Sequence, residues 1–205
     1  CDLLVYLLMN PEASPMSRTM GANFPFLKEG NVGLQVMAIY TAVEEVSSTE
    51  GVRQGEIFKG LLEDYSDLVF QADKGFKTSE SQRIGMVASL ESASGICNER
   101  EPLDNAFKNL ESIIKNVGRL FYISLTHHTE NRFGGGNYST PGLKSDGEAL
   151  LDYIDGREIA IDLSHTSDAL AHDILDYTYR KGLKVPVIAS HSNFRDVWDH
   201  KRNLT

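Results

Sequence analysis

Cysteine is scarce in this sequence, and long apolar runs are missing. The two cysteines, Cys1 and Cys97, fit the spacing of no zinc-ribbon or redox motif, and a single pair is weak evidence for a disulfide framework. We therefore expect two free thiols and a cytoplasmic location. A signal or an anchor outside the chain stays open. No apolar run approaches the ~20 residues of a membrane-spanning helix, so we expect no transmembrane segment in this chain.

Positive charge is also in short supply. Lysine and arginine total 20 against 29 aspartate and glutamate residues, which gives a formal net charge of −9. The basic residues are scattered singly and form no patch along the sequence. A chain with this balance repels phosphate backbones, so nucleic acid is excluded as a partner.

The rest of the composition is that of an ordinary globular protein. A length of 205 residues with 41% hydrophobic residues suits one core, and without an internal repeat or a linker we expect a single domain over residues 1–205. Most apolar runs of strand length are nearly continuous, as in parallel strands buried on both faces. The predicted strands are 2–8, 33–40, 84–90, 120–125, 158–163 and 185–189.

Helical patterns fill the gaps between these strands. Apolar residues at helical spacing predict helices over 53–72 and 102–117, and a third helix is predicted over 145–155. Ser167 is the expected N-cap of a fourth helix, which Gly182 ends. The alternation of strand and helix predicts a parallel sheet, and both a doubly wound sheet and a (β/α) barrel fit this order.

Chemically active side chains stand at the ends of four predicted strands. They are Glu91, the adjacent pair His127 and His128, His165, and His191. In a barrel the carboxyl ends of parallel strands converge on one rim, and histidine and carboxylate ligands suit zinc or a similar divalent ion. A lone histidine is more often a structural residue, but the coincidence over four strands favours a metal site. Of the two adjacent histidines, we expect one to be functional and the other to be a neighbour.

Other features near these strand ends are less specific. Asp162 could orient a ligand histidine, or it could be a buried aspartate bonded to backbone inside the barrel. Ser164 and Ser190 precede histidines, but without the geometry of a catalytic triad we do not interpret them as nucleophiles. The polar, glycine-rich stretch 131–142 is predicted to be one long loop, and loops of that length are often functional.

Several segments taken together resemble the blocks of one family. In the C-terminal part they are SLTHHTEN, GLKSDGEALL, AIDLSHTSDA, VIASHSNFRDV and KRN, and upstream stands NFPFLKEGNVGLQVMAIYT. These segments are similar to the corresponding blocks of the membrane dipeptidase family, peptidase family M19. Each motif is weak alone, whereas the ordered set is specific and covers nearly the whole chain.

The resemblance implies a (β/α)8 TIM barrel of the metal-dependent hydrolase type, with two zinc ions that serve the hydrolysis of dipeptides. By position, Glu91 matches the carboxylate that bridges the ions, and His165 and His191 match the ligands of one ion. Asp2 matches a ligand of the other ion, in a His-x-Asp motif whose middle residue is Cys1 and whose histidine would precede the chain. A hydroxide that bridges the ions attacks the peptide bond, so Glu91 also counts among the catalytic residues.

Two further positions carry over from the family. His127 matches the catalytic histidine that contacts the substrate and polarises the scissile carbonyl. Arg202 matches the arginine that binds the substrate carboxylate, a bidentate pairing that lysine could not reproduce. The resemblance thus implies a small dipeptide as substrate, and it makes a homodimer the expected assembly.

The sequence departs from the family pattern at two places. Ser92 follows Glu91 where the family usually has glycine, which alters the turn but spares the ligand. The chain ends at Thr205, before the strands that carry the family's acid/base aspartate. Because about six strands are predicted and a full barrel needs ~250 residues, we expect an incomplete barrel, truncated at both ends.

Two alternatives to a dipeptidase stay open. The first is another metal-dependent amidohydrolase that acts on acylated amino acids or lactams, which would lack the preference for a free carboxylate that Arg202 implies. The second is an inactive fragment that retains the fold. The missing first-strand histidine and the missing acid/base aspartate support that second alternative.

Overall fold

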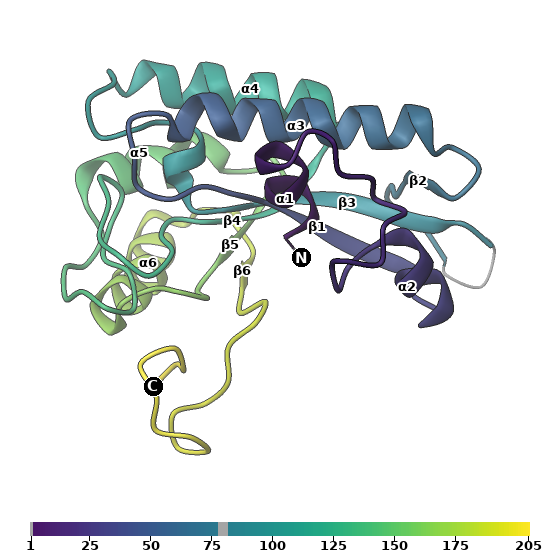
Figure 1. Ribbon diagram of the computed structural model, residues 1–205. Coiled ribbons are helices and arrows are strands. Elements are labelled where there is room, and N and C mark those ends of the chain that lie inside the picture. Colours follow the sequence, from purple (N-terminus) through teal and green to yellow (C-terminus); the bar gives the residue numbers. More distant parts are fainter. Residues whose placement is uncertain (1, 78–81) are drawn as a thin grey trace.

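The computed structural model describes residues 2–77 and 82–205, and it contains one parallel β-sheet with helices packed against it (Figure 1). The strands run in the order β1-β3-β4-β5-β6, and β2 pairs with the amino end of β3. Among the described residues no pairing joins β1 to β6, so the sheet is open, which is consistent with the expected incomplete barrel. The strands are β1 Leu34–Tyr40, β2 Val69–Gln71, β3 Ile84–Glu91, β4 Leu120–Ser124, β5 Ala160–Asp162 and β6 Val187–Ile188.

The helices follow the strands as a βα arrangement requires. α3 and α4 lie side by side across one face of the sheet (Figure 1). The predicted caps of α6 are confirmed: the Ser167 hydroxyl accepts from the backbone N of Leu170 at 3.0 Å, and Gly182 ends the helix at φ +65°. The helices are α1 Leu3–Met9, α2 Phe24–Glu29, α3 Ser47–Asp64, α4 Asp104–Val117, α5 Ser145–Ile154 and α6 Asp168–Lys181.

The central strand β3 confirms the expectation of a sheet buried on both faces. Every residue from Ile84 to Leu90 is buried, and only the terminal Glu91 is partly open. Leu110 and Ile113 of α4 are fully buried and belong to the same hydrophobic core as β3. Continuous apolar runs thus mark the interior strands, as the parallel arrangement requires.

The predicted strand over 2–8 is wrong, because this segment forms α1. A short apolar run is compatible with a strand or with a buried helix, and periodicity alone does not separate the two. In the structure α1 packs against α3 and β1, which buries Leu3 and Leu4 and leaves Met9 exposed.

The predicted helix over 53–72 is wrong at both ends. α3 already begins at Ser47 and ends at Asp64, and the following residues form the unpredicted strand β2. Leu68 continues the helical spacing of the apolar residues, but pairing with β3 buries Val69 completely and makes this segment a strand. The count of six strands is therefore right although one predicted strand is a helix.

Within the part of the chain that the structure describes, no helix has both the length and the apolar character needed to cross a membrane.

A close backbone contact holds α3 against the turn that follows β3. That turn is the short 3₁₀ helix η2 Ala93–Gly95. A Cβ atom placed on Gly51 of α3 would lie 2.0 Å from the carbonyl oxygen of Gly95. Because backbone cannot yield as a flexible side chain can, this approach requires glycine at position 51, and it fixes the turn immediately after Glu91.

We expect Gly51→Ala to lower the free energy of unfolding by about 1–3 kcal/mol or more, because it forces α3 away from η2. The matched control is Gly60→Ala in the same helix, where nothing lies within 4 Å of the new Cβ. That change should be neutral or stabilising by about 0.5–1 kcal/mol, since alanine favours helix more than glycine does. Urea unfolding of both variants measures the difference, and equal effects would contradict the close contact.

Candidate metal centre

The carboxyl ends of the five main strands form one row across the sheet. Each residue of the row pairs with the next in the parallel register, in the order Tyr40, Glu91, Ser124, Asp162 and Ile188. His127, His165 and His191 each stand three residues after a member of this row. The strands therefore deliver three histidines to one level beside Glu91, which confirms the expectation that the strand ends converge.

Glu91 lies at the centre of these histidines. Its Oε1 atom is 3.1 Å from Nε2 of His165, 3.3 Å from Nε2 of His191 and 3.9 Å from Nε2 of His127. The His165 side chain is 1% exposed and the Glu91 side chain 14%, whereas His191 is 37% exposed. The group thus has a buried side at His165 and an open side at His191.

The His165 ring is aimed by an unusual backbone conformation. His165 has φ +67°, in the left-handed region that residues other than glycine rarely adopt. Its carbonyl oxygen accepts from the backbone N of Asn137 at 2.9 Å and from the Thr126 hydroxyl at 3.2 Å. Strained conformations persist where surrounding contacts hold them and are concentrated at functional sites, so the loop and β4 together turn this histidine toward Glu91.

The glycine-rich loop 131–142 packs against the turns that carry the histidines. Asn137 and Tyr138 bond to the turns that carry His165 and His128, and Gly136 lies between them. A Cβ on Gly136 would come within 2.5 Å of the His128 backbone. Only glycine fits there, because the loop passes directly against the chain that positions the histidines.

The turn after Glu91 explains one departure from the family pattern. Ser92 adopts φ +86°, a conformation that glycine takes without strain. Its hydroxyl accepts from the backbone N of Ser94 at 3.3 Å, which satisfies one donor of the turn. Ser92 therefore adopts a backbone conformation that favours glycine, and its hydroxyl caps the 3₁₀ helix η2 that follows Glu91.

Electrostatics favour a charged Glu91 among neutral rings. Burial opposes ionisation, but the close contacts with His165 and His191 outweigh it and hold the pKa of Glu91 well below its usual range. Burial, followed by the nearby His165, lowers the pKa of His127 to about 4. Burial also lowers the pKa of His165. Near neutral pH the two buried rings are neutral and offer lone pairs.

The residues fit a divalent ion. Glu91, His165 and His191 each present one ligand atom within 4.8 Å of the others. The separations of 3.1 and 3.3 Å from the Glu91 oxygen match the ~3.3 Å edge of a tetrahedron with bonds of about 2.0–2.1 Å to zinc. His127, His128 and His165 form a second such group, and Nδ1 of His165 is buried without a hydrogen-bond partner among the described residues.

Sequence reasoning undervalued two residues here. His128, interpreted as one of a pair with a single functional member, belongs to the second group and bonds through Nδ1 to the Asn137 side chain at 3.1 Å. Tyr40 pairs with Glu91 in the parallel register. Its ring packs edge-on against the His127 ring, with 4.7 Å between the ring centroids. The signal for Tyr40 is its place at the end of the predicted strand 33–40.

Arg202 approaches the same histidines from the C-terminal segment. Burial is the main cause of the low pKa values of His127 and His165, and the positive charge of Arg202 adds to it. The guanidinium group makes no hydrogen bond or ion pair with any residue that the structure describes. A cation without a partner therefore stands near the candidate metal centre.

Asp2 does not join either histidine group among the described residues. It is exposed and precedes α1, where its side chain makes no cap hydrogen bond. After burial, Glu91 and Glu44, its charge is among the causes that raise the pKa of Tyr40. Cys1 lies outside the described residues, and Cys97 is a buried free cysteine.

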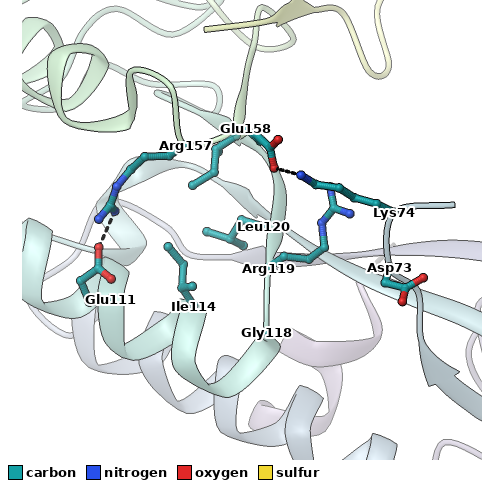
Figure 2. Close-up of a pocket in the computed structure, with 10 residues that line it drawn as sticks. Asp73, Lys74, Glu111, Ile114, Gly118, Arg119, Leu120, Arg157 and Glu158 are labelled. Atoms are coloured by element: carbon teal, nitrogen blue, oxygen red, sulfur yellow. Dashed lines mark hydrogen bonds and ion pairs between the residues drawn. The ribbon is translucent and has the colours of Figure 1, made fainter. Parts of the chain in front are cut away.

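A cavity of about 540 Å³ lies at the other end of the sheet, where β4 and β5 begin (Figure 2). Four of its six charged side chains form pairs, Lys74 with Glu158 and Arg157 with Glu111 (Figure 2). Paired charges do not converge on a ligand, and the amino-terminal face of such barrels serves stability. The chemistry therefore belongs to the histidine end.

Known proteins resemble this chain over most or all of its length. The family model described as "Membrane dipeptidase (Peptidase family M19)" matches residues 1–205. Dipeptidase verJ of Clonostachys rogersoniana is 32% identical over 158 residues, which cover 74% of this chain and 37% of that protein. The chain thus spans little more than a third of the length of this curated relative.

Solved structures share the fold. A metallopeptidase of Rhodobacter sphaeroides, crystallised with a phosphinate mimic of the dipeptide L-Ala-D-Ala, has a TM-score of 0.80 at 18% identity, covering 100% of this chain and 66% of that one. The dipeptidase AC, a metallopeptidase of family M19, has a TM-score of 0.73 at 21% identity, covering 100% and 64%.

We expect Glu91→Gln to weaken the binding of zinc and cobalt, because it removes the negative charge between His165 and His191. The affinity for the metal should fall by more than about 10- to 100-fold, which is the loss seen when a residue that only orients a metal ligand is removed. Glu111→Gln is the matched control, since Glu111 bonds to Arg157 and Tyr153 away from the histidines. Competition titration against a chelator measures the affinity, and equal affinity of the two variants would contradict the assignment.

Proposed function

The chain belongs to the membrane dipeptidase family, peptidase family M19, and from this membership we propose that the protein is a zinc-dependent dipeptidase. The observation that carries the proposal is that Nε2 of His165 and Nε2 of His191 lie 3.1 and 3.3 Å from the same Glu91 oxygen. Glu91, His165 and His191 would hold one of two zinc ions, and such ions would supply an activated water near neutral pH and polarise the carbonyl of the peptide bond. The remaining steps fall to the side chains of the chain itself.

His127 is placed to assist at the scissile carbonyl. It stands 3.9 Å from Glu91 through Nε2, and its ring packs against Tyr40 and His165. An N–H group held there would donate to the carbonyl oxygen as negative charge develops in the transition state. Because neighbouring rings fix its direction, the donor needs little reorganisation during the reaction.

Arg202 supplies the specificity for a free carboxylate. Its guanidinium group has no partner among the described residues and lies close enough to influence His127 and His165. A substrate carboxylate would pair with it in a bidentate geometry. A carboxylate held one residue from the scissile bond selects dipeptides over longer peptides.

The second ion requires ligands beyond the Glu91 group. We propose Asp2 as one of them, on its match to the His-x-Asp motif of the family and its effect on Tyr40. The homodimer and the cytoplasmic location stay predictions.

We expect zinc-dependent hydrolysis of a panel of dipeptides by the metal-stripped and then reconstituted protein, and its loss in His165→Ala. His172→Ala is the control, because His172 is exposed on α6. Chromatographic detection of the released amino acids measures the rate. Bound zinc without cleavage of any dipeptide would favour another amide substrate, such as an acylated amino acid or a lactam.

We expect Arg202→Met to raise KM for dipeptides by about 10- to 100-fold with a smaller effect on kcat, because bonds to a charged group contribute about 1.5–3 kcal/mol. Arg202→Lys should restore part of the loss. Arg119→Met, at the opposite end of the sheet, should leave KM unchanged. Steady-state kinetics on dipeptides and their C-terminal amides provide the test, and equal effects on both substrates would contradict the carboxylate role.

A further inference from the structure

Asp162 ties together the ends of three strands. Its side chain is fully buried. Oδ1 accepts from the backbone N of Ser164 at 3.1 Å and of Ser190 at 2.8 Å. Oδ2 accepts from the hydroxyls of Ser124 at 3.0 Å and Ser190 at 2.6 Å. All four of these groups, which belong to three serines, donate, so the carboxylate acts as an acceptor only.

The Ser190 hydroxyl donates its hydrogen to Asp162. A serine hydroxyl has a single hydrogen to donate, and the bond to Asp162 uses it. The same oxygen lies 2.6 Å from Nδ1 of His191, so it must accept there, and Nδ1 carries the proton. Nε2 of the neutral ring then has a free lone pair, and this atom is the one that faces Glu91 at 3.3 Å.

We propose that Asp162 and Ser190 are positioning residues that fix the tautomer and the direction of the His191 ring, so that Nε2 stays available as a metal ligand. The inference rests on the metal centre of the proposed function. The sequence left two roles open for Asp162, orienting a ligand histidine or bonding to backbone. Both apply, because the backbone bonds anchor the same carboxylate that acts through Ser190.

The two histidines beside Glu91 are held by different means. His165 is buried and turned by its backbone, and its Nδ1 has no partner among the described residues. His191 is 37% exposed, so packing alone does not fix its ring. Its backbone N bonds to the Ser164 hydroxyl at 3.0 Å, and its ring bonds to Ser190. Changes at Asp162 should therefore act through His191.

Asp162→Asn reverses the direction of the hydrogen bonds without changing the shape of the side chain. The two backbone N–H groups hold the amide oxygen of the new residue in the place of Oδ1. Its NH₂ group then faces Ser190 and donates to it. The Ser190 hydrogen turns to Nδ1 of His191, and the proton of the ring moves to Nε2, where it blocks the lone pair.

The test measures the tautomer and the metal affinity in the whole protein. Nitrogen-15 NMR of the metal-free protein at about pH 8, where an ordinary histidine is neutral, reports which ring nitrogen of His191 carries the proton. We expect Nδ1–H in the wild type and Nε2–H in Asp162→Asn. Zinc affinity should fall by about 10- to 100-fold in Asp162→Asn. Asp152→Asn, at a carboxylate that accepts from Tyr177 on the outer helices, should match the wild type.

Ser190→Ala keeps the experiment decisive if Asp162→Asn does not fold. It removes the link without reversing it, so we expect both tautomers and a smaller loss of zinc affinity than for Asp162→Asn. An unchanged tautomer, or unchanged zinc affinity in both variants, would overturn the positioning role. A wild-type protein that binds no zinc would instead contradict the proposed function, while the tautomers of the metal-free variants would still decide the role of Asp162.

Discussion

Parallel pairing of β3, β4, β5 and β6 sets the level at which every side chain of the site stands. Each strand ends in register with its neighbour, and the histidines follow after the same short interval. A slip of one residue in any strand would turn its side chains to the other face. The site thus depends on the register, and the bonds of Asp162 link the ends of β4 and β5 to Ser190 after β6 at this level.

Negative charge is the second constraint, and it is placed where it can be compensated. Glu91 is partly buried and surrounded by imidazole rings, and Asp162 is fully buried among hydrogen-bond donors. A buried carboxylate is costly unless it is paired or bonded. The protein itself supplies the hydrogen-bond donors that Asp162 needs. Glu91 instead stands beside histidine nitrogens, and a bound cation would compensate its charge and bind these nitrogens together with it. This contrast separates the structural carboxylate from the one proposed to bind metal.

Errors in the prediction of the fold occurred where the local pattern was ambiguous. The segment 2–8 is apolar on all sides and could be a strand or a helix, and only its packing against α3 and β1 made it α1. Residues 69–71 continue a helical spacing, yet pairing with β3 made them a strand. In both places tertiary contacts outweighed the local preference. The long interior strands and the capped helix α6 carried clear signals and agree with the prediction.

The sequence by itself determined the alternation of strands and helices, the residue types at the strand ends and the family to which they belong. These follow from hydrophobic period, caps and motif order, which are local properties. Tertiary structure alone decided that His165 takes a left-handed conformation, that the glycine-rich loop braces it, and that Asp162 reaches His191 through Ser190. Those relations join residues far apart in the chain, and hydrogen-bond direction depends on distances that no sequence spacing contains.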